Sequence, residues 1–223
     1  GCTDAKKLAD QGCHIWDKFG TCEFLHDVGI FDREDGDLGP IYGFQWRHFG
    51  AEYADCNADY KRKGKDQLQR CITEISVNPF SRRMLVSAWN PSAEHLMALP
   101  PCHYAYQFYV SSDRTEVSML VNMRSVDIGL GLPYNIASYA LLLNMVCRIT
   151  GKKPGDLTFC LGDTHIYVNH LEALKLQLER EPRRQPELRV NKRSYKSIDD
   201  FTLSDFEVLW YDPHPAIKME IAV

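Results

Sequence analysis

The sequence predicts a single domain of mixed α/β class, on the strength of three observations. The chain has 223 residues and shows no internal repeat, low-complexity tract or linker that would divide it. Residues 103–110 alternate between apolar or aromatic and other side chains in the way of a half-buried strand. Residues 136–150 form a segment of helical length that is apolar on nearly all sides, which favours a helix at the centre of the protein.

The first part of the chain predicts a short helix followed by loops. Thr3 or Asp4 can cap a helix that runs from Ala5 to about Trp16. Residues 32–43 are rich in Asp, Gly and Pro, which indicates a loop. The aromatic cluster at residues 44–50 also contains an Arg and a His, and it is more typical of a core corner with a polar rim than of a ligand wall.

The middle and end of the chain supply the predicted sheet and its helices. Asp66 caps an amphipathic helix, and Asn78-Pro79 ends it. The apolar segment at 136–150 is followed by Gly151, a typical residue after a helix end. We expect strands at 84–89, after Cys102, at 115–123, at 157–167, near 188–190 and near 206–211, and a surface helix at 169–181.

Composition excludes several classes of protein. The chain is 44% hydrophobic and 25% charged, as is ordinary for a globular protein. Its net charge of −4 argues against a nucleic acid or an anionic membrane as partner. No apolar run approaches the roughly 20 residues that cross a bilayer. The eight cysteines include no C-x-x-C pair, so neither a zinc site nor a redox motif is expected, and reduced thiols in the cytosol fit better than a disulfide scaffold.

The most conspicuous chemical candidate is Cys102, which follows Leu99-Pro100-Pro101 and precedes His103. Two prolines stiffen the approach to the thiol, and a cysteine presented at the mouth of a strand is a plausible nucleophile. A lone cysteine is more commonly a small buried hydrophobic residue. Both interpretations stay open on this stretch alone.

Three arginines fall at the ends of predicted strands, namely Arg82, Arg83 and Arg124. An arginine fork matches a phosphate, and Ser125 would add a hydroxyl donor. Ordinary surface charges are the alternative for Arg82 and Arg83. The nearby Gly129-x-Gly131 lacks the third glycine and the strand-to-helix context of a dinucleotide-binding fingerprint.

Polar residues near the apolar helix could recognise a nucleoside through hydrogen bonds. Asn135 is either the N-cap of that helix or an amide that matches an N–H beside a C=O on a pyrimidine edge. His165 and Tyr167 lie two apart on a predicted strand, so they face the same side and could together hold a sugar hydroxyl. Satisfied polar groups in a core are the alternative for both.

Taken together, these residues lie in segments that resemble the thymidylate synthase family. The segments, in order, are IWD (15–17), GDLGPIYGFQWRHFGAEY (36–53), SRR (81–83), MALPPCH (97–103), QFYV (107–110), RSxD (124–127), LGLPYNIASYALL (130–142), GDTHIYxNH (162–170), REP (180–182) and YDPHPxIKME (211–220). They span nearly the whole chain, residues 1–223, as one domain. The resemblance implies a large mixed sheet that packs back to back in a homodimer, with a central buried helix.

The resemblance also implies an activity, the reductive methylation of dUMP to dTMP. The co-substrate would be 5,10-methylenetetrahydrofolate, which supplies both the carbon and the reducing equivalents and leaves as dihydrofolate, with no metal involved. The implied location is cytoplasmic, with nuclear or mitochondrial pools as alternatives. The partners would be dUMP, the reduced folate and a second copy of the chain.

Site roles follow from the same resemblance. Cys102 would be the nucleophile that adds to C6 of the uracil ring, and Asn135 would read N3–H and O4. Tyr42 and His103 would belong to the polar network around the pyrimidine. The remaining dUMP contacts would be Arg124, Ser125, Val126 and Asp127 of the same chain, His165 and Tyr167 at the deoxyribose hydroxyl, and Arg82 and Arg83 at the partner's phosphate. The folate contacts would be Trp16, Leu99, Asp127, Gly131, Tyr134 and Ala222, with the last three residues of the chain closing over the folate.

The chain departs from the family pattern in three respects. The family begins with a segment that carries a general-base Glu, a phosphate-binding Arg and a folate-contacting His, so we expect sequence upstream of Gly1, which in a fusion would include dihydrofolate reductase. Met123 stands where the family usually has Gln, and Tyr134 stands where it has Phe. These departures raise the question of whether this chain alone is fully active.

Two other functions are therefore considered. One is a deoxynucleotide hydroxymethylase of the same fold, which has Asp at the position of Asn135; Asn135 and, by resemblance, Trp16 favour methyl transfer to uracil instead. The other is a catalytically silent homologue that binds nucleotide or only dimerises.

Overall fold

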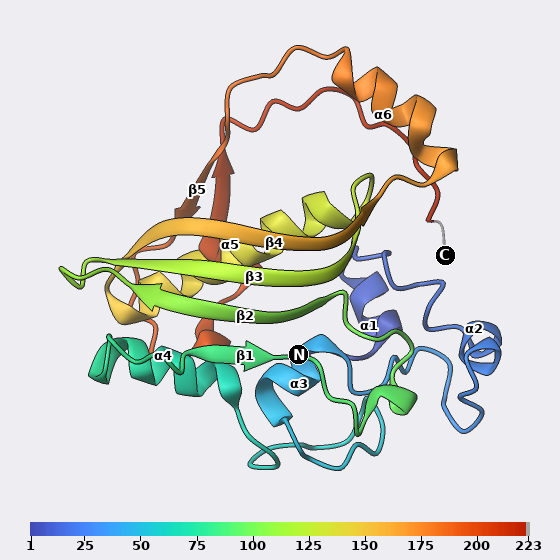
Figure 1. The fold of residues 1–223 in the computed structure, drawn as a ribbon, viewed down its shortest axis with the longest axis horizontal. Coiled ribbons are helices and arrows are strands. Elements are labelled where there is room, and N and C mark those ends of the chain that lie inside the picture. The colour runs from blue at the N-terminus through green and yellow to red at the C-terminus, as the bar shows by residue number, and fades with distance from the viewer. Residues whose placement is uncertain (222–223) are drawn as a thin grey trace.

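A four-stranded mixed sheet forms the middle of the molecule in the computed structural model, which describes residues 1–221 (Figure 1). Its strands are β1 (Leu85–Ser87), β2 (His103–Val110), β3 (Glu116–Asp127) and β4 (Lys153–His165), in that spatial order. β1 and β2, like β2 and β3, are antiparallel, whereas β3 and β4 are parallel. The predicted mixed α/β class is confirmed, although β1 is shorter and β3 longer than expected.

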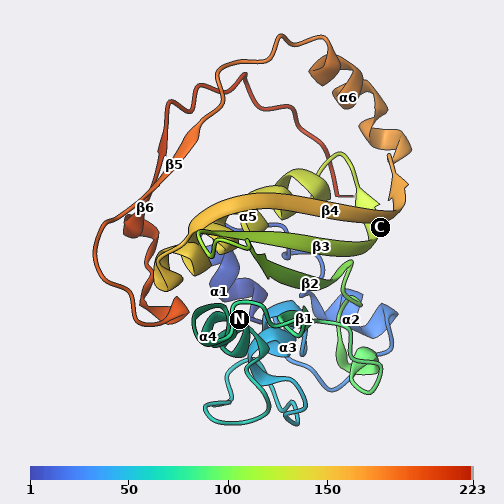
Figure 2. The same ribbon diagram turned by 60° about the vertical axis from the view of Figure 1, so that its left-hand side comes forward.

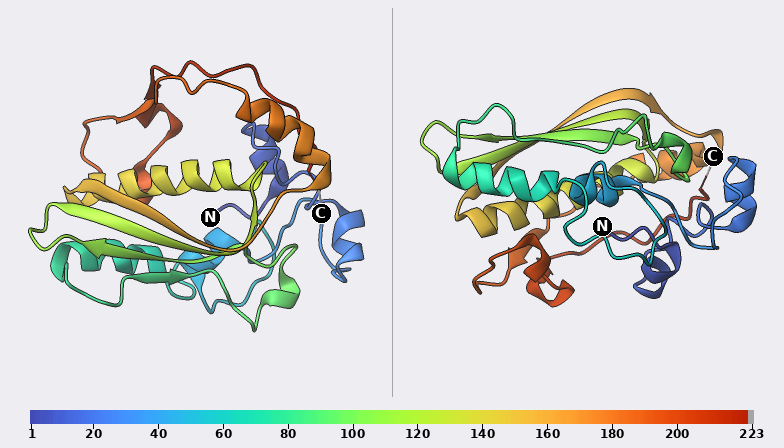
Figure 3. Two further views of the ribbon diagram at one scale, coloured as in Figure 1. Left: turned by 45° about the horizontal axis from the view of Figure 1, so that its top comes forward. Right: turned by 90° about the horizontal axis from the view of Figure 1, so that it is seen from below.

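Three helices cover one face of this sheet and form the main core with it (Figure 3). They are α3 (Tyr42–His48), α4 (Gln67–Val77) and α5 (Gly131–Thr150). α4 agrees with the sequence pattern, because the Asp66 side chain accepts the backbone N–H of Gln69 and the helix stops before Asn78. Its buried side chains are Leu68, Cys71, Ile72 and Ile75. They pack against strand residues such as Val86, Tyr106, Phe108 and Met119.

The start of α5 corrects one of the predictions. The helix begins at Gly131, so Asn135 lies inside it and is not the N-cap. The carboxylate of Asp127, at the end of β3, accepts the backbone N–H groups of Gly129, Leu130 and Gly131 at 2.9–3.3 Å. These bonds satisfy the first turn of the helix from outside it, which frees Asn135 from capping.

The burial of α5 also differs from the prediction. Because residues 136–150 are apolar on nearly all sides, the sequence predicted a helix that is buried all round. Its buried residues are Tyr139, Leu143, Val146 and Cys147, which face β3, β4 and α4. Ile136, on the same stripe but near the start of the helix, is 44% exposed. Within residues 1–221 the helix is therefore a cover for one sheet face, and its N-terminal turns are the more exposed part.

The opposite face of the sheet carries no helix from the described part of the chain (Figure 3, right). Two cross-strand rows lie on it. One joins Leu85, Gln107, Leu120 and Thr158, and the other joins Ala105, Asn122 and Cys160. Tyr109 on the same face is 64% exposed.

The N-terminal part folds on a second, smaller core. α1 (Ala5–Asp10) is capped by Asp4 and ends well before the predicted Trp16, because Gly12 takes a left-handed φ of 83° and turns the chain away. α2 (Cys22–Asp27) follows. Apolar residues including Leu25, Leu38 and Met97 form this core. The cluster at 44–50 is the helical corner expected, with Phe44 and Gln45 buried.

The C-terminal part arches away beyond the β4 edge of the sheet and returns (Figures 1 and 2). It contains the 3₁₀ turn η2 (Val168–His170), α6 (Leu171–Leu178) and a ribbon of β5 (Glu187–Val190) with β6 (Phe206–Leu209). The predicted helix at 169–181 is thus shorter than expected. Shorter 3₁₀ turns are η1 (Glu94–Leu96), η3 (Ile198–Asp200) and η4 (Leu203–Asp205). The helices described in residues 1–221 all lack the combination of length and apolar character that a membrane span needs.

Candidate active site

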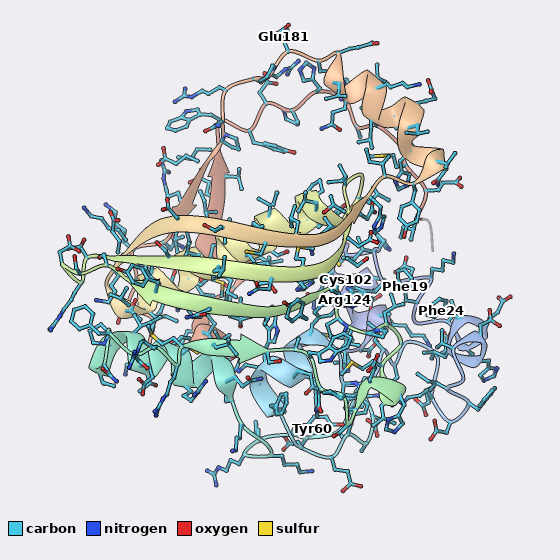
Figure 4. All side chains as sticks on the ribbon, in the orientation of Figure 1. Phe19, Phe24, Tyr60, Cys102, Arg124 and Glu181 are labelled. Atoms are coloured by element: carbon cyan, nitrogen blue, oxygen red, sulfur yellow. The ribbon has the colours of Figure 1, made fainter. Side chains whose placement is uncertain are left out.

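Cys102 lies half-buried directly before β2, in a turn that is held from two sides. Its backbone N–H donates to the Tyr42 hydroxyl at 2.9 Å, and its carbonyl accepts the backbone N–H of Arg124 at 2.9 Å. The Arg124 side chain also donates from Nε to the Pro101 carbonyl at 3.0 Å and from Nη2 to the Pro100 carbonyl at 2.9 Å. The rigid thiol-bearing turn expected from the two prolines is therefore fixed by hydrogen bonds as well. Figure 4 shows Cys102 and Arg124 side by side at one end of the strands.

Arg124 keeps donors to spare for an anion. A guanidinium has five N–H donors, and the two carbonyl contacts use two of them. Its Cζ lies 5.6 Å from the centre of the Trp89 ring, which steadies the side chain by a cation–π contact. The side chain is exposed at its outer end. Three N–H groups beside Cys102 thus remain available to a phosphate.

A chain of aromatic residues backs the cysteine turn. The rings of Tyr42 and His103 stack at 4.1 Å, and His103 Nδ1 lies 2.7 Å from the Tyr139 hydroxyl. Burial lowers the pKa of His103 to about 3, so the imidazole is neutral near pH 7. Burial, together with the nearby Cys102, raises the pKa of Tyr42 and keeps its phenol protonated. Since the Tyr42 oxygen accepts from Cys102, its own proton is free to donate to a ligand.

Tyr42 also has an unusual backbone. Its φ is +23°, a region that a bulky side chain rarely adopts. Such strain persists only where surrounding contacts impose it, and it concentrates at functional sites. Tyr42 also contacts Cys102 and His103, which supports a positional role for this residue.

The parallel pairing of β3 and β4 brings four polar residues together. Ser125 is opposite Asp163, and Asp127 is opposite His165. His165 Nδ1 lies 2.9 Å from the Asp163 carboxylate, and the His165 and Tyr167 rings are 5.0 Å apart. Burial raises the pKa of Tyr167, and the charges of Asp127 and Cys102 add to that shift. β4 ends at His165, so the prediction that Tyr167 lies on the same strand is wrong, but the two rings still lie together at the sheet end near Cys102.

The predicted base and folate contacts border the same place. Asn135 is half-buried, and within residues 1–221 its side-chain amide has no hydrogen-bond partner. A Cβ on Gly131 would lie 3.4 Å from the Asp127 Cβ and 3.8 Å from the Asn135 Oδ1, so the glycine keeps this corner open. Trp16 packs 5.9 Å from the Tyr42 ring.

The other predicted site residues differ in how far their side chains are buried. Leu99 is half-buried in the loop before Cys102, and Tyr134 is 55% exposed on the first turn of α5. The side chain of Val126 is fully buried in the main core, so only its backbone could meet a ligand. Ala222 lies outside the described residues. Met123 is buried opposite His103 on β2.

Arg82 and Arg83 do not join the Cys102 site within one chain. They are exposed before β1, beside a surface hollow of about 420 Å³ that Arg70, Glu74 and Asn78 also line. β1 runs antiparallel to β2, so this hollow lies some seven strand residues from Cys102, which is roughly 23 Å.

Sequence reasoning missed two residues that support the site, Trp89 beneath Arg124 and Tyr139 against His103. Tyr139 carries a usable signal, since a tyrosine in an otherwise apolar helix needs a partner for its hydroxyl. Within residues 1–221, no three His, Cys, Asp or Glu side chains are grouped to hold a metal ion.

Comparison with known proteins adds independent evidence. The family model described as thymidylate synthase matches residues 1–223. The chain is 56% identical over 223 residues to the thymidylate synthase of Homo sapiens, covering all of this chain and 70% of that protein. It is 50% identical over 230 residues to the thymidylate synthase of Saccharomyces cerevisiae, covering 75% of it. It is also 52% identical to a bifunctional dihydrofolate reductase-thymidylate synthase of Leishmania major, covering 43% of that longer protein.

Proposed function

The chain belongs to the thymidylate synthase family of methyltransferases, and from this premise we propose that it reductively methylates dUMP to dTMP. The co-substrate is 5,10-methylenetetrahydrofolate, and the proposed location is the cytoplasm. The observation that carries the proposal is the Cys102 turn, held by the arginine that also offers free donors to a phosphate.

Cys102 is the proposed nucleophile. Its thiolate forms a bond to C6 of the uracil ring, and the electron pair of the C5–C6 double bond moves onto C5, where it is delocalised into the C4 carbonyl. The Arg124 guanidinium lies next to this turn and orients it. The enolate oxygen at C4 then needs a hydrogen-bond donor, a role that suits the free Asn135 amide.

Binding of the nucleotide uses the polar ends of β3 and β4. The three free N–H groups of Arg124 and the Ser125 hydroxyl hold the phosphate. His165 and Tyr167 hold the deoxyribose hydroxyl, while Tyr42 and His103 order the polar groups around the base. Val126 contributes through its backbone, and Asp127 lies at the boundary between nucleotide and folate.

The folate supplies the one-carbon unit and the hydride when it is bound. The residues around its proposed place suit a flat heterocycle, because Trp16 offers an aromatic face beside Tyr42 and Gly131 leaves room next to Asp127. Leu99 and Tyr134 complete the lining. The C-terminal residues, with Ala222 against the folate, exclude water from the reacting carbon.

The functional unit is proposed to be a two-fold homodimer. Two features support it. The sheet face that carries Leu85, Leu120 and Tyr109 beside polar residues is left bare within residues 1–221, and a sheet face with exposed large apolar side chains calls for a partner. Arg82 and Arg83 are also too far from Cys102 to serve their own site, so they would reach the phosphate in the partner's site.

The hydroxymethylase alternative is disfavoured by Asn135. Uracil presents N3–H and O4, and an amide can accept from the first and donate to the second. A carboxylate could not donate to O4. A catalytically silent homologue remains a distinct outcome of the following test.

The test is the intact mass of the protein after incubation with 5-fluoro-dUMP and 5,10-methylenetetrahydrofolate. Fluorine at C5 cannot leave as the proton would, so a competent enzyme accumulates a covalent adduct of protein, nucleotide and folate. Wild type should form this adduct, and Cys102→Ala should not. The Cys2→Ala variant is the matched control, because Cys2 is an exposed thiol outside the sheet, and it should react like wild type. A folded protein that forms no adduct would support the silent homologue instead.

A further inference from the structure

His170 is a fully buried histidine that the proposed mechanism does not use. It ends η2 and directly precedes α6. Its Nε2 lies 2.7 Å from the carbonyl oxygen of Glu220, and Asn169 donates to the same oxygen at 3.3 Å. Because a carbonyl only accepts, Nε2 carries the hydrogen in this contact. Two consecutive side chains thus hold the backbone of the residue that precedes the last three.

The other ring nitrogen of His170 points at the proposed folate site. Nδ1 lies 3.7 Å from Oδ1 of Asp127, which is beyond hydrogen-bond distance. Among residues 1–221 this buried nitrogen has no hydrogen-bond partner. A buried polar atom of this kind calls for an explanation. Asp127 itself is the carboxylate that holds the start of α5.

The space for the ring is built into the sequence. A Cβ on Gly129 would lie 2.7 Å from His170 Nδ1 and 3.3 Å from its Cγ. Gly129 does not have a positive φ, so glycine is needed here for room and not for backbone conformation. The Tyr167 ring closes the other side, edge-on at 5.6 Å. The ring is therefore fixed between Gly129, Tyr167 and Asp127.

We propose that His170 is a positioning residue that couples the C-terminal tail to Asp127 and so holds the tail in register with the folate. This inference rests on the proposed function. The imidazole is a rigid body that bonds the Glu220 carbonyl through Nε2, while its other edge packs beside Gly129 and lies 3.7 Å from Asp127 Oδ1. The ring thus links the tail to the loop before α5 by one hydrogen bond at Glu220 and by packing beside Gly129 and Asp127. Its loss affects folate binding and leaves nucleotide binding to the Arg124 side of the site.

The first experiment compares His170→Leu with His170→Gln in the intact protein. Leucine fills the space without a donor, whereas the glutamine amide can reach the position of Nε2 and donate to the Glu220 carbonyl. Loss of that bond should raise the KM for the folate about 10-fold in His170→Leu, with the Kd for dUMP within about twofold of wild type. His170→Gln should recover most of the folate affinity. Equal losses for dUMP and folate, or no rescue by glutamine, would show a packing role only and overturn the proposal.

The second experiment asks whether His170 acts through the tail. Deletion of residues 221–223 should itself raise the folate KM, and His170→Leu should add little to that deletion, since the two changes remove one interaction. Additive effects would contradict the coupling. His214→Leu is the matched control, because His214 is half-buried, lies outside the proposed site and also contacts a backbone carbonyl, that of Glu181 at 2.9 Å. The His214→Leu variant should change neither the KM for the folate nor the Kd for dUMP.

A third readout does not depend on catalysis. Amide hydrogen exchange of residues 218–221 should speed up in His170→Leu and in Gly129→Ala, which displaces the ring, and stay unchanged in His214→Leu. Unchanged exchange in both ring variants would overturn the anchoring role. If wild type formed no adduct with 5-fluoro-dUMP, the proposed function would fail while this readout would still decide whether His170 anchors the tail.

Discussion

Arg124 holds Cys102 in place through the peptide backbone on both sides of the bond that joins Pro101 to Cys102. Its N–H donates to the Cys102 carbonyl at 2.9 Å, and its side chain binds the carbonyls of Pro101 and Pro100 at 3.0 and 2.9 Å. One arginine therefore orients the nucleophile while its remaining donors face solvent. In the proposed enzyme the same residue holds the substrate phosphate, so nucleotide binding and thiol placement depend on one side chain.

The first prediction concerns Arg124→Lys. Lysine keeps the charge but cannot donate to two carbonyls and a phosphate as a planar fork, so both affinity and reactivity should fall. We expect the rate of adduct formation with 5-fluoro-dUMP to drop about 100-fold or more, on the scale of two lost charged hydrogen bonds. Arg148→Lys serves as control, because Arg148 is an exposed residue at the far end of α5, and wild-type rates are expected for it. A wild-type rate in Arg124→Lys would contradict the double role.

The second prediction is a pH dependence of stability. Burial lowers the pKa of His103 from 6.5 to about 3 in the folded protein. The unfolded state therefore binds the proton more readily, so the contribution of His103 is fully present above pH 6.5 and is lost as the pH falls towards 3. Between pH 7.5 and pH 5 the free energy of unfolding should drop by about 2 kcal/mol from this residue. Urea unfolding at both pH values measures it.

The control for that prediction is His103→Gln. Glutamine does not titrate, so this variant should be less stable at pH 7.5 but lose about 2 kcal/mol less than wild type on going to pH 5. The comparison removes the contributions of all other titrating groups. Equal losses in the two proteins would show that His103 is not held neutral by burial.

Local sequence patterns were sufficient to predict an element where capping residues and the spacing of apolar residues determine its bounds. Asp66, the spacing of Leu68, Cys71, Ile72 and Ile75, and Asn78-Pro79 define α4 almost to the residue. The start of α5 could not be predicted in this way. Asp127 takes over the capping role through loop geometry, and nothing in the local pattern distinguishes that from a cap by Asn135.

For the site, the residues alone indicated a candidate nucleophile, phosphate-binding arginines and an amide for the base. Only the motif resemblance indicated that they belong to one nucleotide site. The structure brings Cys102, Arg124 and Tyr42 together and shows why Arg82 and Arg83 cannot join them in one chain. Contacts across the fold, such as that between His170 and Glu220, have no local signature, because the partners are 50 residues apart.

The third prediction tests an ion-pair bridge that ties the C-terminal arch to the core. Arg47 donates to Asp66 at 2.8 Å and, through both terminal nitrogens, to Asp199 at 2.8 Å. Arg47 lowers the pKa of Asp199. Arg47→Met should reduce the free energy of unfolding by about 2 kcal/mol, because a partly buried fork is lost while Asp66 stays. The exposed pair of Arg189 and Glu207 is the control, and Arg189→Met should change stability by less than about 0.5 kcal/mol.

The fourth prediction concerns the choice of base. Asn135→Asp replaces the amide donor by a carboxyl group, which when ionised accepts only and matches the amino group of cytosine. We expect the ratio of kcat/KM for dUMP to that for dCMP to fall by about 100-fold or more. Steady-state rates with both nucleotides give the ratio. An unchanged ratio would remove Asn135 from base recognition.

The last prediction tests whether the site is shared between two subunits. Cys102→Ser and Arg83→Ala should each be nearly inactive as homodimers, because every site lacks either the nucleophile or the partner's phosphate donor. When the two variants are unfolded, mixed in equal amounts and refolded, half of the dimers are mixed. Each mixed dimer has one site with Cys102 from one chain and Arg83 from the other, so activity should return to about a quarter of wild type. The matched control replaces Arg83→Ala by Arg124→Ala. Since Arg124 serves the same chain's site, as its bonds beside Cys102 require, mixing it with Cys102→Ser should restore nothing. Recovery in both mixtures, or in neither, would contradict the proposed division of the arginines between the subunits.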